Sequence, residues 1–288
     1  MVYVLALGAA ALFGLGSAVQ QRAASRAPEG LVLHWRLLWY LVRQRLWLVG
    51  VGTAVVGNVL SALALGKGGV ALVQPLLVTR LLFALPIAAT WERRRLSRRE
   101  WGGAIAISGG LGAFLVAGRP EEGGETDAPI WIWLLIVGLV GLITGGLVKL
   151  ARRLAPAKEA PVLGVGAGML FGLQSALTDT AMGRLFDDGL LALLLHWSPY
   201  AVAAVAVTGT LLLQSAFRLE PLEASYPPLA AVEPLAGVAI GLGVLGGTVR
   251  VAPQWLAIEA AGLLVMTAGV WVLAKAAVAY ERSLERDA

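Results

Sequence analysis

The stretch VQPLLVTRLLFALP (residues 73–86) holds one charged residue, Arg80, among nine aliphatic or aromatic residues. It lies within an apolar run, 70–91, that is long enough to cross a membrane as a helix. In such a helix Arg80 lies near the bilayer midplane, where an arginine costs at least ~2.5–3.5 kcal/mol on insertion scales. The stretch therefore predicts both a membrane span and a partner for its arginine.

The composition of the whole chain indicates an all-α integral membrane protein. The 288 residues are 58% hydrophobic and only 14% charged, and the mean hydropathy is +0.77. A soluble domain carries nearer a quarter charged residues. The chain has no cysteine, which excludes disulfides, iron–sulfur clusters and zinc–thiolate sites. His34 and His196 are too few for a histidine-rich metal site, so we expect no cofactor and no metal centre.

Apolar runs of about 20 residues predict nine membrane spans. Residues 31–45 differ, because Arg36, Tyr40, Arg43 and Gln44 fall on one face of a helix. This pattern favours an amphipathic helix in the membrane interface over the alternative, a short tenth span. The nine predicted spans are residues 2–22, 46–65, 70–91, 101–118, 130–150, 161–181, 195–217, 224–247 and 255–277.

The basic residues between the spans predict the orientation. The segments after odd-numbered spans hold 18 Lys and Arg, and those after even-numbered spans hold 4. The positive-inside rule then places the N-terminus outside and the C-terminus in the cytoplasm, as expected for a multi-pass protein of the cytoplasmic membrane. The acidic loop 119–129 is expected outside. The accumulation of basic residues on the cytoplasmic side thus explains the net charge of +5, and we expect no nucleic-acid partner.

A weak internal repeat divides the chain into two halves. FGLGSA (13–18) and FGLQSA (171–176) match at five of six positions. The repeat pairs spans 1–4 with spans 6–9, and a shift of five spans inverts one half relative to the other. The predicted divisions are residues 1–118 for the first repeat, 119–155 for the acidic loop and connector span, and 156–288 for the second repeat. Both first spans carry a face of small residues suited to close helix contact, Ala6, Ala10, Gly14 and Ala18 in one and Gly164, Gly168, Gly172 and Ala176 in the other.

WLVGVGTAVVGNVLSALALGKGGVALVQPLL (47–77) resembles the drug/metabolite transporter superfamily, especially its NIPA-type magnesium-transporter-like and EamA-like branch. ERRRLSRREWGGAIAISGGL (92–111) is similar to the turn and Gly-rich fourth span of that superfamily. Nine spans also suit this branch. The resemblance implies a membrane transporter. One position departs from it, since the family's Gly-Glu pair is Gly57-Asn58 here. Magnesium sites usually use one or two carboxylates, so this loss argues against carrying over magnesium transport.

Two ionisable residues, Arg80 and Glu233, lie near the middle of their spans and are the main site candidates. In the repeat alignment Glu233 matches Thr79, so the two charges occupy nearly equivalent places in the two halves. We expect them to pair across the centre, either lining a transport path or as a static structural ion pair. Further candidates for a polar cavity are Asn58, Gln74, Gln174 and Gln214, and weaker ones, expected near the interfaces, are Glu259 and Asp179.

The sequence favours a secondary transporter that moves a small polar solute by alternating access, coupled to protons or to an exchanged solute. No nucleotide-binding motif is present to couple ATP to transport directly. A transporter of Mg²⁺ or another divalent cation is the first alternative, following the resemblance. A membrane enzyme or assembly subunit is the second, but no cluster of catalytic side chains near one interface indicates an enzyme.

Overall fold

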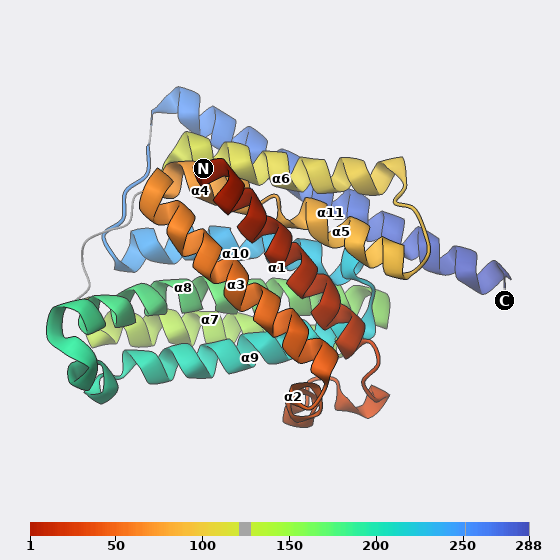
Figure 1. The fold of residues 1–288 in the computed structure, drawn as a ribbon, viewed down its shortest axis with the longest axis horizontal. Helices are drawn as coiled ribbons and strands as arrows, with labels where there is room; N and C mark the ends of the chain where they lie inside the picture. The colour runs from red at the N-terminus through yellow and green to blue at the C-terminus, as the bar shows by residue number, and fades with distance from the viewer. Residues whose placement is uncertain (121–127, 251, 288) are drawn as a thin grey trace.

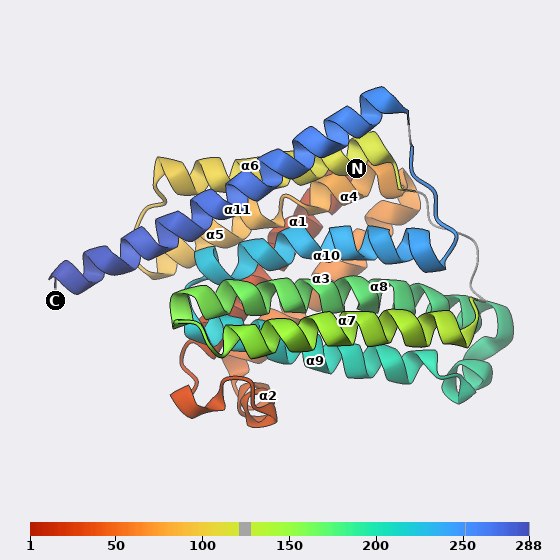
Figure 2. The ribbon, with the colours of Figure 1, turned by 180° about the vertical axis from the view of Figure 1, so that it is seen from behind.

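The computed structural model describes residues 1–120, 128–250 and 252–287, and almost all of them are α-helical. Among these residues, nine helical spans are long and apolar enough to cross a membrane, so the protein is a multi-pass membrane protein. The helices are α1 Val2–Ala24, η1 Glu29–Leu31, α2 Trp35–Val42, α3 Arg45–Gly68, α4 Val70–Leu77, α5 Arg80–Trp91, α6 Arg98–Gly118, α7 Ile130–Ala151, α8 Pro156–Leu195, α9 Ser198–Leu219, α10 Leu222–Val244 and α11 Pro253–Asp287. Helices α7, α8, α9 and α10 run side by side, α1 and α3 cross them obliquely, and the short α2 lies at one edge (Figures 1 and 2).

The third span is broken just before its arginine. Residues 70–91 form two helices, α4 and α5, that are interrupted at Val78 and Thr79. Pro75 has no N–H to donate, and the Thr79 hydroxyl donates to the Leu76 carbonyl at 2.6 Å. Arg80 is therefore the first residue of α5 rather than a residue inside one continuous helix.

The sixth span is much longer than its predicted extent of 161–181. Helix α8 runs from Pro156 to Leu195, but the non-helical backbone of Gly189, where φ is +85°, divides it into a long helix and a short one that follows. Glycine tolerates this left-handed backbone because it has no Cβ. The sequence prediction ended the span at 181 because polar residues, among them Arg184, Asp187 and Asp188, follow there. These side chains do not end the helix, since a helix can continue beyond the hydrocarbon layer into water, and Arg184 and Asp188 even pair along it at 2.9 Å.

Residues 31–45 contain only the eight-residue helix α2, which at 1.5 Å per residue is too short to cross a membrane. Leu37 and Leu41 are buried on one side of it, whereas Arg36 and Arg43 are exposed. The predicted amphipathic face is therefore present. The His34 ring accepts a hydrogen bond from the Arg36 N–H and caps the helix start.

Small residues fix the helix packing. Helix α1 packs against α3 and α5, α8 packs against α9 and α10, and α6 packs against α11. The predicted small-residue faces of α1 and α8 are buried. A Cβ placed on Gly164 would lie 2.6 Å from the Ser225 carbonyl oxygen, and one on Gly168 would lie 3.0 Å from that of Leu229. The prediction that these glycines bring helix backbones into contact is confirmed.

Helices α6 and α11 meet through a reciprocal contact. A Cβ on Gly110 would lie 2.5 Å from the Gly262 carbonyl oxygen, and a Cβ on Gly262 would lie 2.6 Å from that of Gly110. The two helices run in opposite directions (Figure 2). The same kind of contact joins Gly103 to Gly269 further along. Each helix thus contacts the other through a pair of glycines.

Most basic side chains gather at one end of the bundle, which we call the basic end. It holds the ends of α1, α5, α7 and α9 and the starts of α3, α6, α8 and α10, and α2 lies beside it (Figure 1). Arg22 donates to the Trp91 carbonyl at 3.4 Å, and Arg218 donates to the Ala27 carbonyl. The acidic loop 119–129 leaves from the opposite end, but its residues 121–127 lie outside the described residues.

Candidate functional site

The central feature of the bundle is an ion pair between Arg80 and Glu233. Arg80 Nη2 donates to Glu233 Oε2 at 2.6 Å, which joins the start of α5 to the middle of α10. The two side chains are 19% and 30% exposed, so the pair is neither sealed in the core nor on the open surface. The Tyr226 ring lies 5.8 Å from the Arg80 guanidinium carbon. The expected contact between Arg80 and Glu233 is confirmed.

Two glycines lie directly against the backbones of Arg80 and Glu233. A Cβ on Gly14 of α1 would lie 2.7 Å from the Arg80 carbonyl oxygen. A Cβ on Gly172 of α8 would lie 2.7 Å from the Glu233 carbonyl oxygen. Arg80 therefore contacts α1 in the same way as Glu233 contacts α8. The structure thus matches Glu233 with Arg80, whereas the sequence alignment matched it with the neighbouring Thr79. Because glycine has no side chain, the backbones of α1 and α8 lie directly against those of the two charged residues.

No hydrogen bond joins the four amide candidates to this pair in the part of the chain that the structure describes. Asn58 lies exposed on α3, and Gln74 is half-buried on α4. Gln174 is half-buried, and no hydrogen-bond partner is described for its buried Oε1 atom. Gln214 is fully buried and donates to Gln20 at 2.7 Å, tying α9 to α1.

This last contact holds the end of α1 in the bundle. Gln20 lies near the end of α1, and its side chain accepts the hydrogen bond of Gln214. The end of α1 packs against α9, so the amide is satisfied by protein instead of by solvent. The two glutamines thus join helices, which is the ordinary role of such groups in a bundle.

The weaker candidates lie towards the opposite end of the bundle from the basic end. Glu259 packs on the last turn of α6, where a Cβ on Gly118 would lie 3.2 Å from Glu259 Oε1. That oxygen is buried, and no hydrogen-bond partner is described for it. Asp179 is exposed, next to the buried Thr180 of α8. Neither residue belongs to the Arg80–Glu233 contact.

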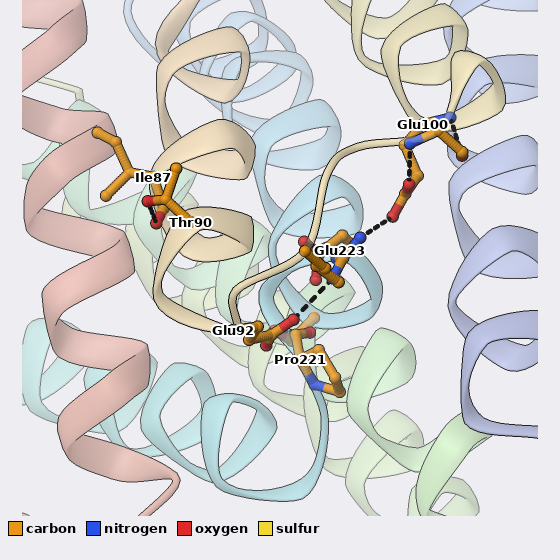
Figure 3. A network of polar contacts seen from close by, with 9 residues as sticks. Ile87, Thr90, Glu92, Glu100, Pro221 and Glu223 are labelled. Atoms are coloured by element: carbon orange, nitrogen blue, oxygen red, sulfur yellow. Dashed lines mark hydrogen bonds and ion pairs between the residues drawn. The ribbon is translucent and has the colours of Figure 1, made fainter. Parts of the chain in front are cut away.

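A second charged cluster, which the sequence did not predict, lies at the basic end. Arg94 donates from Nε to Glu92 at 2.8 Å, from Nη1 to Glu100 at 2.7 Å and from Nη2 to Glu223 at 2.5 Å. Figure 3 shows the three glutamates converging from the end of α5, the start of α6 and the start of α10. Burial lowers the pKa of Arg94, but the charge of Glu223 and the hydrogen bonds to Glu92 and Glu100 outweigh it and raise the pKa above its ordinary value. We call Glu92, Arg94, Glu100 and Glu223 the Arg94 cluster.

Local structure holds the loop of this cluster in place. Ser97 begins α6 with a capping box, in which its hydroxyl accepts from the Glu100 N–H and Glu100 accepts from the Ser97 N–H. Arg93 has φ of +56°, a backbone that non-glycine residues rarely adopt. The Ser-x-x-Glu spacing could have predicted the helix start, but nothing in the sequence brings Glu223 to Arg94 across 129 positions.

An open cleft of about 400 Å³ lies at the same end of the bundle. Its lining includes Arg22, Trp91, Arg218 and Glu220, from α1, α5, α9 and the connection between α9 and α10. At 1.5 Å per residue, Trp91 is roughly 16 Å along α5 from Arg80. The cleft is thus separate from the central pair, and neither Arg80 nor Glu233 lines it.

Comparison with known proteins identifies a relative of similar length. The chain is 31% identical over 278 residues to an uncharacterized protein of Corynebacterium glutamicum, and the match covers 96% of this chain and 95% of the relative. The chain belongs to the same family as this protein. No family model and no solved structure matches the sequence. In the described part of this family member, no group of three or more His, Asp or Glu side chains is arranged to hold a metal ion.

Proposed function

We propose that the protein is a secondary transporter that moves a small polar solute across the cytoplasmic membrane by alternating access. The observation that carries this proposal is the ion pair of Arg80 and Glu233 at the centre of the bundle. A pair of charges at this depth that is also 19% and 30% exposed is costly against lipid. The exposed part of the pair therefore faces a polar path, along which water and solute reach it.

The helix contacts support two inverted repeats as the framework of this transporter. Helix α1 packs on α3 and α5 as α8 packs on α9 and α10, and Gly14 and Gly172 make matching contacts to Arg80 and Glu233. The reciprocal contact of Gly110 with Gly262 is what a two-fold axis between α6 and α11 produces. Inverted repeats with a site between them near midplane are the architecture of many secondary transporters. The resemblance to the drug/metabolite transporter superfamily points the same way.

The orientation follows from charge. We place the basic end in the cytoplasm, because basic residues accumulate on the cytoplasmic side of membrane proteins. The N-terminus and the acidic loop are then outside, and the C-terminus is inside. The cleft beside Arg22 and Trp91 becomes the cytoplasmic mouth of the path, and the Arg94 cluster lies at the same level.

Ligand screening of the purified protein tests the proposal. Amines, amino acids, nucleosides and metal ions are each added, and the thermal unfolding temperature is measured, because a ligand that binds only the folded state stabilises it. We expect at least one polar solute to raise this temperature and to be taken up by vesicles containing the protein. The matched control is the double change Arg80→Ala with Glu233→Ala, which removes the site and leaves no unpaired charge. A solute that stabilises the parent and the control equally, or binding without uptake, would overturn the assignment.

A further inference from the structure

The Arg94 cluster has more negative charge than its single arginine can balance. Three carboxylates, those of Glu92, Glu100 and Glu223, contact one guanidinium, so the fully ionised cluster has a formal charge of −2. Glu100 and Glu223 are buried, with side chains 6% and 1% exposed. A buried excess charge is expensive, and binding one proton lowers it.

The hydrogen bonds decide which carboxylate takes the proton. Glu100 has a partner on each oxygen, Arg94 on Oε1 and the Ser97 N–H on Oε2. Glu92 is 32% exposed, so water can solvate its charge. Glu223 contacts Arg94 through Oε1, and its buried Oε2 has no described hydrogen-bond partner. An oxygen in this position gains most from a proton, since it is buried from water and no other side chain donates to it.

The elements packed around Glu223 carry other charged groups. Helix α8 packs on the first turn of α10 through Gly164 and Ser225, and its nearest acidic residue, Glu159, interacts with Arg152. On the connection from α9, Arg218 and Glu220 line the cleft. The charged groups that act on Glu223 are Arg94, Glu92 and Glu100, and its own backbone N–H also stabilises the carboxylate.

We propose that Glu223 is a proton-binding site that controls the attachment of the α5–α6 loop to α10. A proton from the solvent at the basic end binds the carboxylate and neutralises it. The ion pair with Arg94 is then weakened, while Arg94 keeps its contacts to Glu92 and Glu100. The loop, which belongs to the first half of the chain, is released from the helix of the second half.

The sequence of α10 suits such a release. Pro227 and Pro228 directly follow the first turn and lack the N–H groups that would bond to the carbonyls of Glu223 and Ala224. The first turn is thus weakly tied to the rest of the helix. Glu233 lies ten residues further along the same helix, roughly 15 Å away. If the proposed transport function holds, proton binding at Glu223 opens the cytoplasmic mouth and couples solute movement to protons; the proton site itself does not depend on that function.

Infrared spectroscopy of the full chain in lipid vesicles tests the proton site without any transport assay. On acidification we expect a protonated-carboxyl C=O band that is present in the parent, in Glu92→Gln and in Glu100→Gln, and absent in Glu223→Gln. Asp188→Asn, which removes an exposed carboxylate at the opposite end, is the matched control and should keep the band. A band that survives Glu223→Gln, or that disappears in Glu92→Gln or Glu100→Gln, overturns the assignment. If Glu223→Gln does not fold, Glu92→Gln and Glu100→Gln still test the assignment, because loss of the band in either one contradicts it.

A distance measurement tests the release. The chain has no native cysteine, so spin labels can be attached at Arg95→Cys in the loop and Lys158→Cys at the start of α8, both exposed. We expect the distance distribution to lengthen on acidification in the parent, and to be long and independent of pH in Glu223→Gln. An unchanged distribution in the parent refutes the release. A positive infrared and distance result without solute uptake refutes the transport function and leaves the proton site standing.

Discussion

At the scale of single residues, charged side chains inside the apolar bundle need partners of opposite charge. Arg80 pairs with Glu233 at 2.6 Å. This partner could be predicted, because Glu233 is the only other ionisable residue near the middle of a predicted span. Neither charge is stable alone at that depth, so each fixes the position of the other. This mutual dependence makes the pair accessible to a double-mutant test.

The change Arg80→Ala should therefore destabilise the protein more than the double change Arg80→Ala with Glu233→Ala. The single change leaves Glu233 without its cation, and breaking a fully buried pair costs ~3–5 kcal/mol. Since these side chains are 19% and 30% exposed, we expect a smaller loss, of about 2 kcal/mol. Thermal unfolding of the purified variants measures the order. Equal losses in the single and double variants would show that the two charges do not depend on each other.

The Arg94 cluster could not be predicted in the same way. Its arginine lies in ERRRLSRRE (92–100), where five basic residues are explained by topology alone. Glu223 lies just before the predicted span 224–247 and resembles an ordinary interfacial residue. Only the folded chain shows that it is buried and in contact with Arg94. Similarly, Gln214 could be predicted to lie in the bundle, but its bond to Gln20 depends on how α1 meets α9.

At the scale of elements, close packing of small residues places the functional helices. The faces of α1 and α8 were readable from sequence, since glycine and alanine recur every four residues. The break between α4 and α5 and the extension of α8 to Leu195 were not, because they depend on local hydrogen bonding and on how far a helix reaches beyond the membrane. Hydropathy measures the apolar part of a helix and says little about its ends.

Gly172→Ala tests this packing. A Cβ at this position would lie 2.6 Å from the Ala236 Cβ and 2.7 Å from the Glu233 carbonyl oxygen, so α8 and α10 must move apart. We expect a loss of ~1–3 kcal/mol, typical of overpacking, measured as a lower thermal unfolding temperature. Gly145→Ala on α7, with no atom within 4 Å of the added Cβ, is the matched control and should be neutral or stabilising. Equal effects at the two positions contradict the packing account.

At the scale of the whole molecule, the number of spans and the end with most basic residues followed from the sequence, because hydropathy and charge are summed over many residues. Nine helical spans are present among the described residues, and α7 exposes large apolar side chains such as Leu134 and Leu142, as a lipid-facing helix does. The relation between the halves depends on contacts such as Gly110 with Gly262. These contacts support a symmetric frame in which α5 and α10 carry the central pair, and the central claim is that this pair lies on a path open to each side in turn.

Cysteine accessibility at position 233 tests that claim most directly. Glu233→Cys is placed in the cysteine-free chain, and a charged, membrane-impermeant thiol reagent is added to right-side-out or to inside-out vesicles. The control is Leu142→Cys, whose side chain is 76% exposed on α7 and faces lipid. An alternating-access path predicts that position 233 reacts from both sides and position 142 from neither. Reaction of position 233 from one side only, or from neither side, would contradict the account.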